Sequence, residues 1–122
     1  MEATKSFRGL MVWQEAHKFV LQVYVQTKQF SKDELFGLVS QFRRAAVSIA
    51  ANIAEGYPKR GKSDKLRFLN ISQGSLEECR YYIFLSHDLK YTSDSGQTIL
   101  AGLLDSTSRL LNSYYNVIDK SR

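Results

Sequence analysis

The stretch with the most recognisable chemistry is Gly56–Ser63, which reads GYPKRGKS and matches the phosphate-loop pattern G-x-x-x-x-G-K-[ST] at every fixed position. Such a loop binds a nucleotide when a strand feeds it into a helix, because backbone N–H groups then surround the phosphates and the Ser or Thr holds magnesium. Here the residues before Gly56 continue a helical apolar pattern, and no apolar strand ends in a magnesium-binding Asp. An NTPase activity would rest on this match alone, and we expect none.

The same stretch opens a cluster of positive charge. Residues 59–67 contain five basic side chains and one acidic side chain, namely Lys59, Arg60, Lys62, Lys65, Arg67 and Asp64. A basic loop that leads into a helix N-terminus suits anions, because the first backbone N–H groups are unpaired and the helix dipole is positive there. The alternative is a solvated turn that only keeps the protein soluble. Nearby aromatic residues are limited to Tyr57 and Phe68, so base stacking is weakly supported.

Other residues with chemical potential lack a partner at a useful spacing. His17 and His87 are the only histidines, and neither lies in the Glu-x-x-His pattern of metal-binding bundles. Cys79, the single cysteine, falls on an apolar helical stripe and is expected to be a buried structural thiol. We therefore expect no catalytic residue, no metal site and no cofactor.

Composition points to one helical domain, residues 1–122, in a reducing compartment. The chain is 43% hydrophobic and 24% charged, with a net charge of +5, one proline and one cysteine. The first residues lack the apolar core of a signal peptide, and no apolar run approaches the roughly 18 residues of a membrane span. We expect a cytoplasmic protein that does not enter a membrane.

Apolar residues recur at steps of three and four in four segments, which predicts helices near 10–29, 33–57, 63–90 and 94–119. Short connections make neighbouring helices antiparallel, so the expected fold is an all-α, up-down-up-down four-helix bundle. The first helix should bury the face with Trp13, Ala16, Val20, Tyr24 and Thr27. The third should bury the stripe of Leu69, Ser72, Leu76, Cys79, Ile83 and Ser86.

The second segment has a marked start. Ser31 and Glu34 have the spacing of a capping box, and Phe30 and Leu35 stand where a hydrophobic staple would place them. Gly37 follows early and disfavours helix, so the capped turn could be short, with the long helix restarting near Gly37.

A polar stripe also runs along the second segment. At about 100° per residue, an arc of about 80° contains Gln41, Arg44, Ser48, Asn52 and Glu55. Val47, Ala51 and Ala54 form a flank of small residues beside this stripe, where another helix could approach closely. A helix with so little charge is expected to be covered on more than one side. It is either central to the bundle or part of a subunit interface, and we favour the stripe as an oligomer interface over a solvated surface.

Three runs of sequence resemble one known family. They are VWQEAH at 12–17, the run from SQFRRAA at 40–46 to NIAEG at 52–56, and GSLEE at 74–78. Together they resemble the 23S rRNA intervening-sequence protein family, small bacterial four-helix bundles of which some are labelled ribosomal proteins. The resemblance implies a homopentamer and kinship with the accessory protein of diversity-generating retroelements, a basic pentameric bundle that works with a reverse transcriptase and nucleic acid. Gly9 stands where the family usually has Asp before the first helix, and glycine is a weaker N-cap.

These observations predict a non-enzymatic, oligomeric bundle that binds RNA or DNA backbone through its basic loop. A ring of subunits would repeat one basic patch several times and raise avidity. The runner-up is a protein-interaction or scaffolding bundle that binds a protein partner and no nucleic acid.

Overall fold

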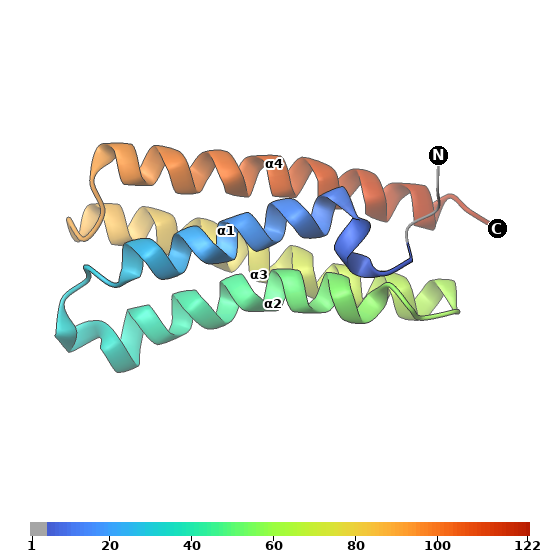
Figure 1. The fold of residues 1–122 in the computed structure, drawn as a ribbon, viewed down its shortest axis with the longest axis horizontal. Coiled ribbons are helices and arrows are strands. Elements are labelled where there is room, and N and C mark those ends of the chain that lie inside the picture. The colour runs from blue at the N-terminus through green and yellow to red at the C-terminus, as the bar shows by residue number, and fades with distance from the viewer. Residues whose placement is uncertain (1–4) are drawn as a thin grey trace.

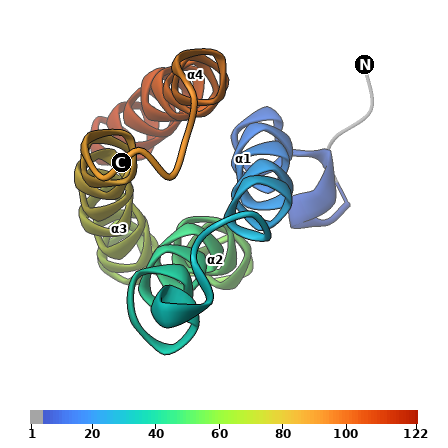
Figure 2. The ribbon, with the colours of Figure 1, turned by 90° about the vertical axis from the view of Figure 1, so that its left-hand side faces the viewer.

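The computed structural model describes residues 5–122, and its fold is a bundle of four long helices (Figure 1). These are α1 (Met11–Thr27), α2 (Ser40–Gly56), α3 (Lys62–Asp88) and α4 (Asp94–Asp119), and no strand occurs in the described range. The chain reverses direction at each connection (Figure 1), and α1 also packs against α4, so that the four helices close around one core (Figure 2). The all-α bundle prediction is confirmed. No helix in residues 5–122 is long and apolar enough to cross a membrane.

The core follows the expected helical stripes except on α1. All six residues of the α3 stripe are buried, and α4 contributes Leu100, Leu104, Thr107 and Leu111. On α1 the buried face is rotated from the predicted one and consists of Val12, Ala16, Phe19, Val23 and Thr27. Trp13 and Val20 are only half-buried and Tyr24 is exposed. The first helix has apolar residues over a wide arc, so the three-four spacing fits more than one face.

The start of the second helical segment differs from the prediction. Lys32–Glu34 form a short 3₁₀ turn and Leu35–Val39 a π-helical turn, with a kink at Gly37, before α2 begins at Ser40. The Ser31 hydroxyl accepts a hydrogen bond from the N–H of Asp33, not Glu34. The Glu34 carboxylate accepts from the Tyr91 hydroxyl at 3.1 Å, so the capping box is not formed. The predicted restart near Gly37 is confirmed.

Two further predictions are wrong, namely the hydrophobic staple between Phe30 and Leu35 and the position of Gly9 as N-cap of the first helix. Phe30 is buried against the Tyr91 ring, at 5.2 Å between centroids, whereas Leu35 is 49% exposed. Gly9 ends a short 3₁₀ helix (Phe7–Gly9), and Leu10 caps α1 without a side-chain hydrogen bond. The side-chain amide of Gln14 instead donates to the backbone carbonyl of Arg8 at 2.9 Å, which ties the preceding turn to the helix.

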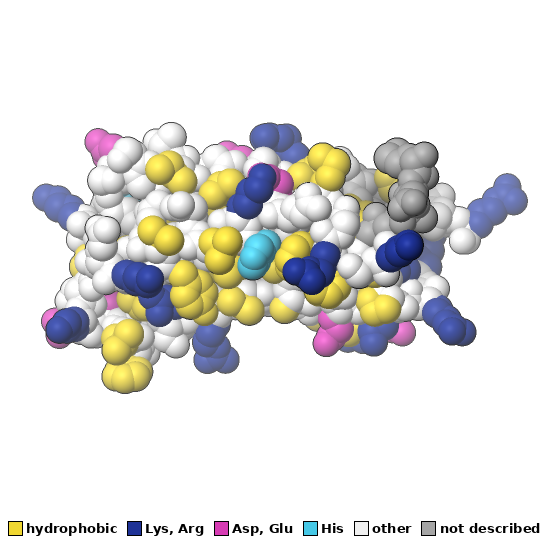
Figure 3. Space-filling view, viewed as in Figure 1, with side chains coloured by type: hydrophobic (Ala, Val, Ile, Leu, Met, Phe, Trp, Pro, Cys, Tyr) yellow, Lys and Arg dark blue, Asp and Glu magenta, His cyan; other side chains and the backbone are white. Residues whose placement is uncertain are grey.

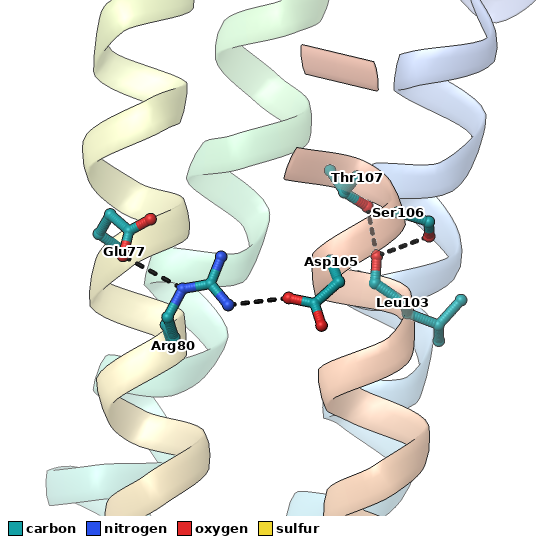
Figure 4. Close-up of polar contacts among 6 residues, drawn as sticks. All are labelled: Glu77, Arg80, Leu103, Asp105, Ser106 and Thr107. Carbon is teal, nitrogen blue, oxygen red and sulfur yellow. Dashed lines mark hydrogen bonds and ion pairs between the residues drawn. The ribbon is translucent and has the colours of Figure 1, made fainter. Parts of the chain in front are cut away.

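Polar side chains tie α4 to both of its neighbours, and Figure 4 shows the contact with α3. Arg80 on α3 donates to Glu77 at 3.2 Å and to Asp105 on α4 at 2.8 Å. On the other side of α4, the Ser106 hydroxyl donates to Glu15 of α1, and this bond holds the pKa of the Glu15 carboxyl below its usual value. The helices are thus fixed in register by directional contacts as well as by the core.

The connection from α3 to α4 begins with a left-handed residue. Lys90 has φ 64°, its N–H donates to the carbonyl of His87, and the N–H of Tyr91 donates to the carbonyl of Ser86. This pair of bonds is the Schellman motif, which satisfies carbonyls at a helix end and usually has glycine in the left-handed position. A lysine there is strained, because its Cβ crowds the following carbonyl.

We predict that Lys90→Gly raises the free energy of unfolding by about 0.5–1 kcal/mol, since relief of the left-handed strain exceeds the entropy cost of glycine. Lys28, at the C-cap of α1 with φ −59°, provides a matched control. Because its conformation is right-handed, Lys28→Gly should lower stability. Urea titrations followed by circular dichroism measure both changes, and equal effects of the two substitutions would contradict the assignment.

Candidate nucleic-acid interface

The phosphate-loop match lies between two helices. Its first glycine, Gly56, is the last residue of α2, and Gly61 is the N-cap of α3. The residues that precede the match are therefore helical, whereas a nucleotide-binding loop follows a strand. What remains of the motif is a basic connection, residues 57–61, that leads into the first turn of α3.

Within the basic cluster, Lys65 serves the fold. Its ammonium group donates to the backbone carbonyls of Gly56, at 3.4 Å, and Tyr57, and it lies 5.5 Å from the centre of the Tyr57 ring. These carbonyls belong to the end of α2, where no further helical turn supplies donors. Gly56 allows the end of α2 to approach α3 closely, since a Cβ at this position would lie 3.0 Å from the Cβ of Phe68. Lys65 thus closes the C-terminus of α2 from the first turn of α3.

Two further cations of the cluster lie over one aromatic ring. The Lys59 ammonium is 5.2 Å and the Arg67 guanidinium 4.6 Å from the centre of the Phe68 ring. Phe68 itself is buried, and Arg67 is also 3.8 Å from the carboxylate of Asp64. The cation–π contacts fix the two basic groups near the bundle surface and leave no open ring face on Phe68.

Arg60 and Lys62 are the most available cations of the cluster. Both side chains are exposed, and the Lys62 ammonium donates to the backbone carbonyl of Ser121 at 2.8 Å. A carbonyl partner leaves the full positive charge in place. The structure therefore gathers four cations that can meet an anion, Lys59, Arg60, Lys62 and Arg67, and assigns Lys65 a structural role that sequence spacing alone did not reveal.

The polar stripe of α2 faces α3 over its central part. The Ser75 hydroxyl donates to the Ser48 hydroxyl at 2.8 Å, and the Asn52 amide donates to the Ser48 side chain at 3.0 Å. The Tyr82 hydroxyl lies 3.1 Å from the side-chain oxygen of Gln41. Burial raises the pKa of this hydroxyl to about 12, aided by its hydrogen bond to a neighbouring carboxylate, so it remains a donor. Three of the five stripe residues therefore bond within the chain.

The other two stripe residues, Arg44 and Glu55, are exposed. Arg44 lies on the ridge between a polar groove on the α3 side and a larger, more apolar groove of about 740 Å³ on the α1 side. The small-residue flank of α2 is partly covered by the chain itself, because Phe7 and Trp13 lie beside Val47, Ala51 and Ala54 around a hollow of about 270 Å³.

The remaining reactive residues occupy structural positions. Cys79 is completely buried, and burial raises the pKa of its thiol far above the usual value. His17 stacks on the Trp13 ring at 4.9 Å, and His87 contacts Asp94 at 2.7 Å across the α3–α4 connection. Across residues 5–122, no group of three or more His, Cys, Asp or Glu side chains could hold a metal ion.

We predict that Lys65→Gln lowers the free energy of unfolding by about 1.5–3 kcal/mol, because carbonyls at the end of α2 lose a charged donor. Lys62→Gln is the matched control, since its partner carbonyl lies beyond the end of α4, and its effect should stay within about 0.5 kcal/mol. Chemical unfolding of both variants measures the difference. A similar loss of unfolding free energy in the two variants would contradict the structural role of Lys65.

Two of three comparisons with known proteins found a match. A family model described as "23S rRNA-intervening sequence protein" matches residues 8–113. A solved structure from Bacteroides thetaiotaomicron, described as a protein with unknown function from the S23 ribosomal protein family, superposes with a TM-score of 0.78 at 21% identity, over 86% of this chain and 95% of that chain. The search of curated proteins returned no match. With the family model covering most of its length, this chain belongs to the 23S rRNA-intervening sequence protein family.

Proposed function

We propose that this protein is a non-enzymatic, self-associating helical bundle that binds the backbone of RNA or DNA through the α2–α3 connection. The observation that carries the proposal is the group of four cations on that connection and the first turns of α3. Within residues 59–67 only Asp64 opposes them, and it is engaged by Arg67. The charges of Lys59, Arg60 and Lys62 are therefore left without an acidic partner in this stretch.

Phosphate is the ligand that fits this arrangement. Arginine and lysine contacts to phosphate oxygens position a nucleic acid without reading its sequence. The N-terminus of α3 adds unpaired backbone N–H groups beside the cations, at the end of the helix where the dipole is positive. Phe68 is buried under two cations, so we propose that base identity contributes little to binding.

The test is a titration of short RNA and DNA duplexes against the wild type and a variant with Lys59, Arg60 and Lys62 changed to Ser. Binding should weaken steeply with salt, with a log–log slope of about −0.9 for each duplex phosphate contacted. The variant should lose most of the affinity, and its shallower slope should correspond to roughly two to three fewer phosphate contacts per subunit. A control with Lys28, Lys32 and Lys90 changed to Ser removes the same charge from the opposite end of the bundle. Equal binding by all three proteins would refute the loop site.

The same titration separates the main alternative. If the wild type binds neither nucleic acid at low salt, the basic connection is a solubilising turn, and the bundle is a scaffold for a protein partner. The exposed apolar residues favour some protein contact in either case, since Phe36 on the π-helical turn is 92% exposed and borders the groove between α1 and α2.

We further propose that this protein contact is with copies of the same chain, in a closed ring for which the family resemblance suggests five subunits. Tyr24, Leu35, Phe36 and Val47 border the α1–α2 groove and are all exposed. Arg43 and Arg44 line it, and no acidic residue does. The Arg43 guanidinium is already held by the Thr27 hydroxyl at 2.9 Å, so the exposed Arg44 is the more available charge of the groove.

We predict that Arg44→Glu weakens self-association, because it reverses the charge at the edge of the groove. Light scattering should give a mass well above the 14.0 kDa monomer for the wild type and a lower mass for the variant at equal concentration. Arg109→Glu makes the same charge change on an exposed position of α4 and should leave the mass unaltered. A wild type that remains monomeric at high concentration would overturn the ring.

A further inference from the structure

Three segments that are far apart in sequence meet at one end of the bundle. The α2–α3 connection lies there, together with residues 5–8 before α1 and with residues 119–122, which comprise the last residue of α4 and the three after it (Figure 1). Dark-blue basic side chains project from this end in the space-filling view (Figure 3). The basic connection is thus one part of a larger surface.

The charge of the molecule is concentrated at this end. Residues 5–8, 55–67 and 119–122 together hold nine basic and three acidic side chains. The rest of the chain holds eight basic and nine acidic side chains. The three segments therefore carry a net charge of +6, which exceeds the net charge of +5 of the whole chain. This concentration is not evident from the sequence, because four of the basic residues lie outside the cluster at 59–67, namely Lys5, Arg8, Lys120 and Arg122.

The segment after α4 is held in place beside the loop. The N–H of Lys120 donates to the carbonyl of Asn116 at 3.0 Å, and the N–H of Ser121 donates to that of Ile118 at 3.1 Å. The carbonyl of Ser121 accepts from the Lys62 ammonium at 2.8 Å. Lys62 therefore joins the basic loop to the segment that carries Lys120 and Arg122, and both of these side chains are exposed.

We infer that these two residues complete the nucleic-acid surface of the α2–α3 loop, and that its ligand is double-stranded nucleic acid held by the phosphates of both strands. The inference rests on the proposed function of the loop and extends it to a surface built from separate segments.

The chemistry of this end favours a duplex over a single strand. Proteins that hold single strands combine cations with aromatic rings on which bases stack. Here Phe68 is buried beneath Lys59 and Arg67, and Tyr57 is half-buried beside Lys65. A duplex presents one negative charge per about 1.7 Å of axis, against one per about 3.4 Å for a single strand, so cations spread over separate segments match the duplex better.

The experiment compares the wild type, a variant with Lys120 and Arg122 changed to Ser, and a control with Lys28 and Lys32 changed to Ser. Each is titrated with a 20-base-pair DNA duplex, roughly two helical turns, and with one of its strands alone, over a range of salt concentrations. Both altered residues of the first variant lie beyond the last residue of α4, so the fold should persist, as circular dichroism will verify.

We expect the Lys120/Arg122 variant to lose about fivefold or more in duplex affinity and one to two phosphate contacts from the salt slope, while the control matches the wild type. The wild type should bind the duplex more tightly than the strand. If the variant binds as the wild type does while the loop substitutions abolish binding, the extended surface is wrong and the loop proposal stands. Stronger binding to the single strand would overturn the duplex assignment, and no binding by the wild type would overturn both proposals.

Discussion

The connections from α2 to α3 and from α3 to α4 are too short to do anything other than reverse the chain, and much of the structure depends on this constraint. Five residues separate α2 from α3, and five separate α3 from α4. Fully extended, five residues reach at most about 18 Å, whereas a helix of 26 residues is about 39 Å long. Both α3 and α4 must therefore pack back along the helix that precedes them. Four such helices return the chain to the end where α1 began, which is why sequence-distant basic residues meet there.

The second long helix, α2, packs against both α1 and α3. Its apolar side enters the core between α1 and α3, and the Ser72 hydroxyl of α3 reaches the carbonyl of Ile49 at 2.9 Å. Ser48 and Asn52 fill the seam beside this contact with hydrogen bonds. Hence three of the five stripe residues are used within the chain, and only Arg44 and Glu55 are left for the proposed contact with another subunit.

Sequence reasoning located the helices well because their limits are marked locally. The fourth helix was predicted to the residue, since Ser93 is a strong N-cap and its hydroxyl accepts from Gly96 at 3.0 Å. All six residues predicted for the α3 stripe are buried, and Phe68 and Ser75 are buried beside them. The face of α1 was misjudged because its apolar arc is wide. The capping box failed because Gly37 interrupts the helix and Tyr91, distant in sequence, takes the Glu34 carboxylate.

The candidate site was only half visible in the sequence for a related reason. Charge density identifies residues 59–67, yet the structural role of Lys65 depends on where the last carbonyls of α2 lie after the turn. Likewise, nothing in the local sequence around Lys120 and Arg122 indicates that Lys62 reaches the carbonyl between them. Local sequence patterns indicate where helices lie, which residues cap them and where charge is concentrated. The contacts of Lys62 and Lys65 instead depend on how the folded chain brings separate helix ends together.

The seam between α1 and α4 also has a consequence for the order of assembly. Its contacts join residues far apart in the chain, such as Glu15 with Ser106 and Gln26 with the carbonyl of Gly96 at 3.1 Å. The other three seams join helices that follow each other, so they close small loops at low entropic cost. The α1–α4 seam must wait until the remaining helices have paired, and it is where the bundle should part first during local unfolding. We therefore expect the contacts between α1 and α4 to form last as the bundle folds.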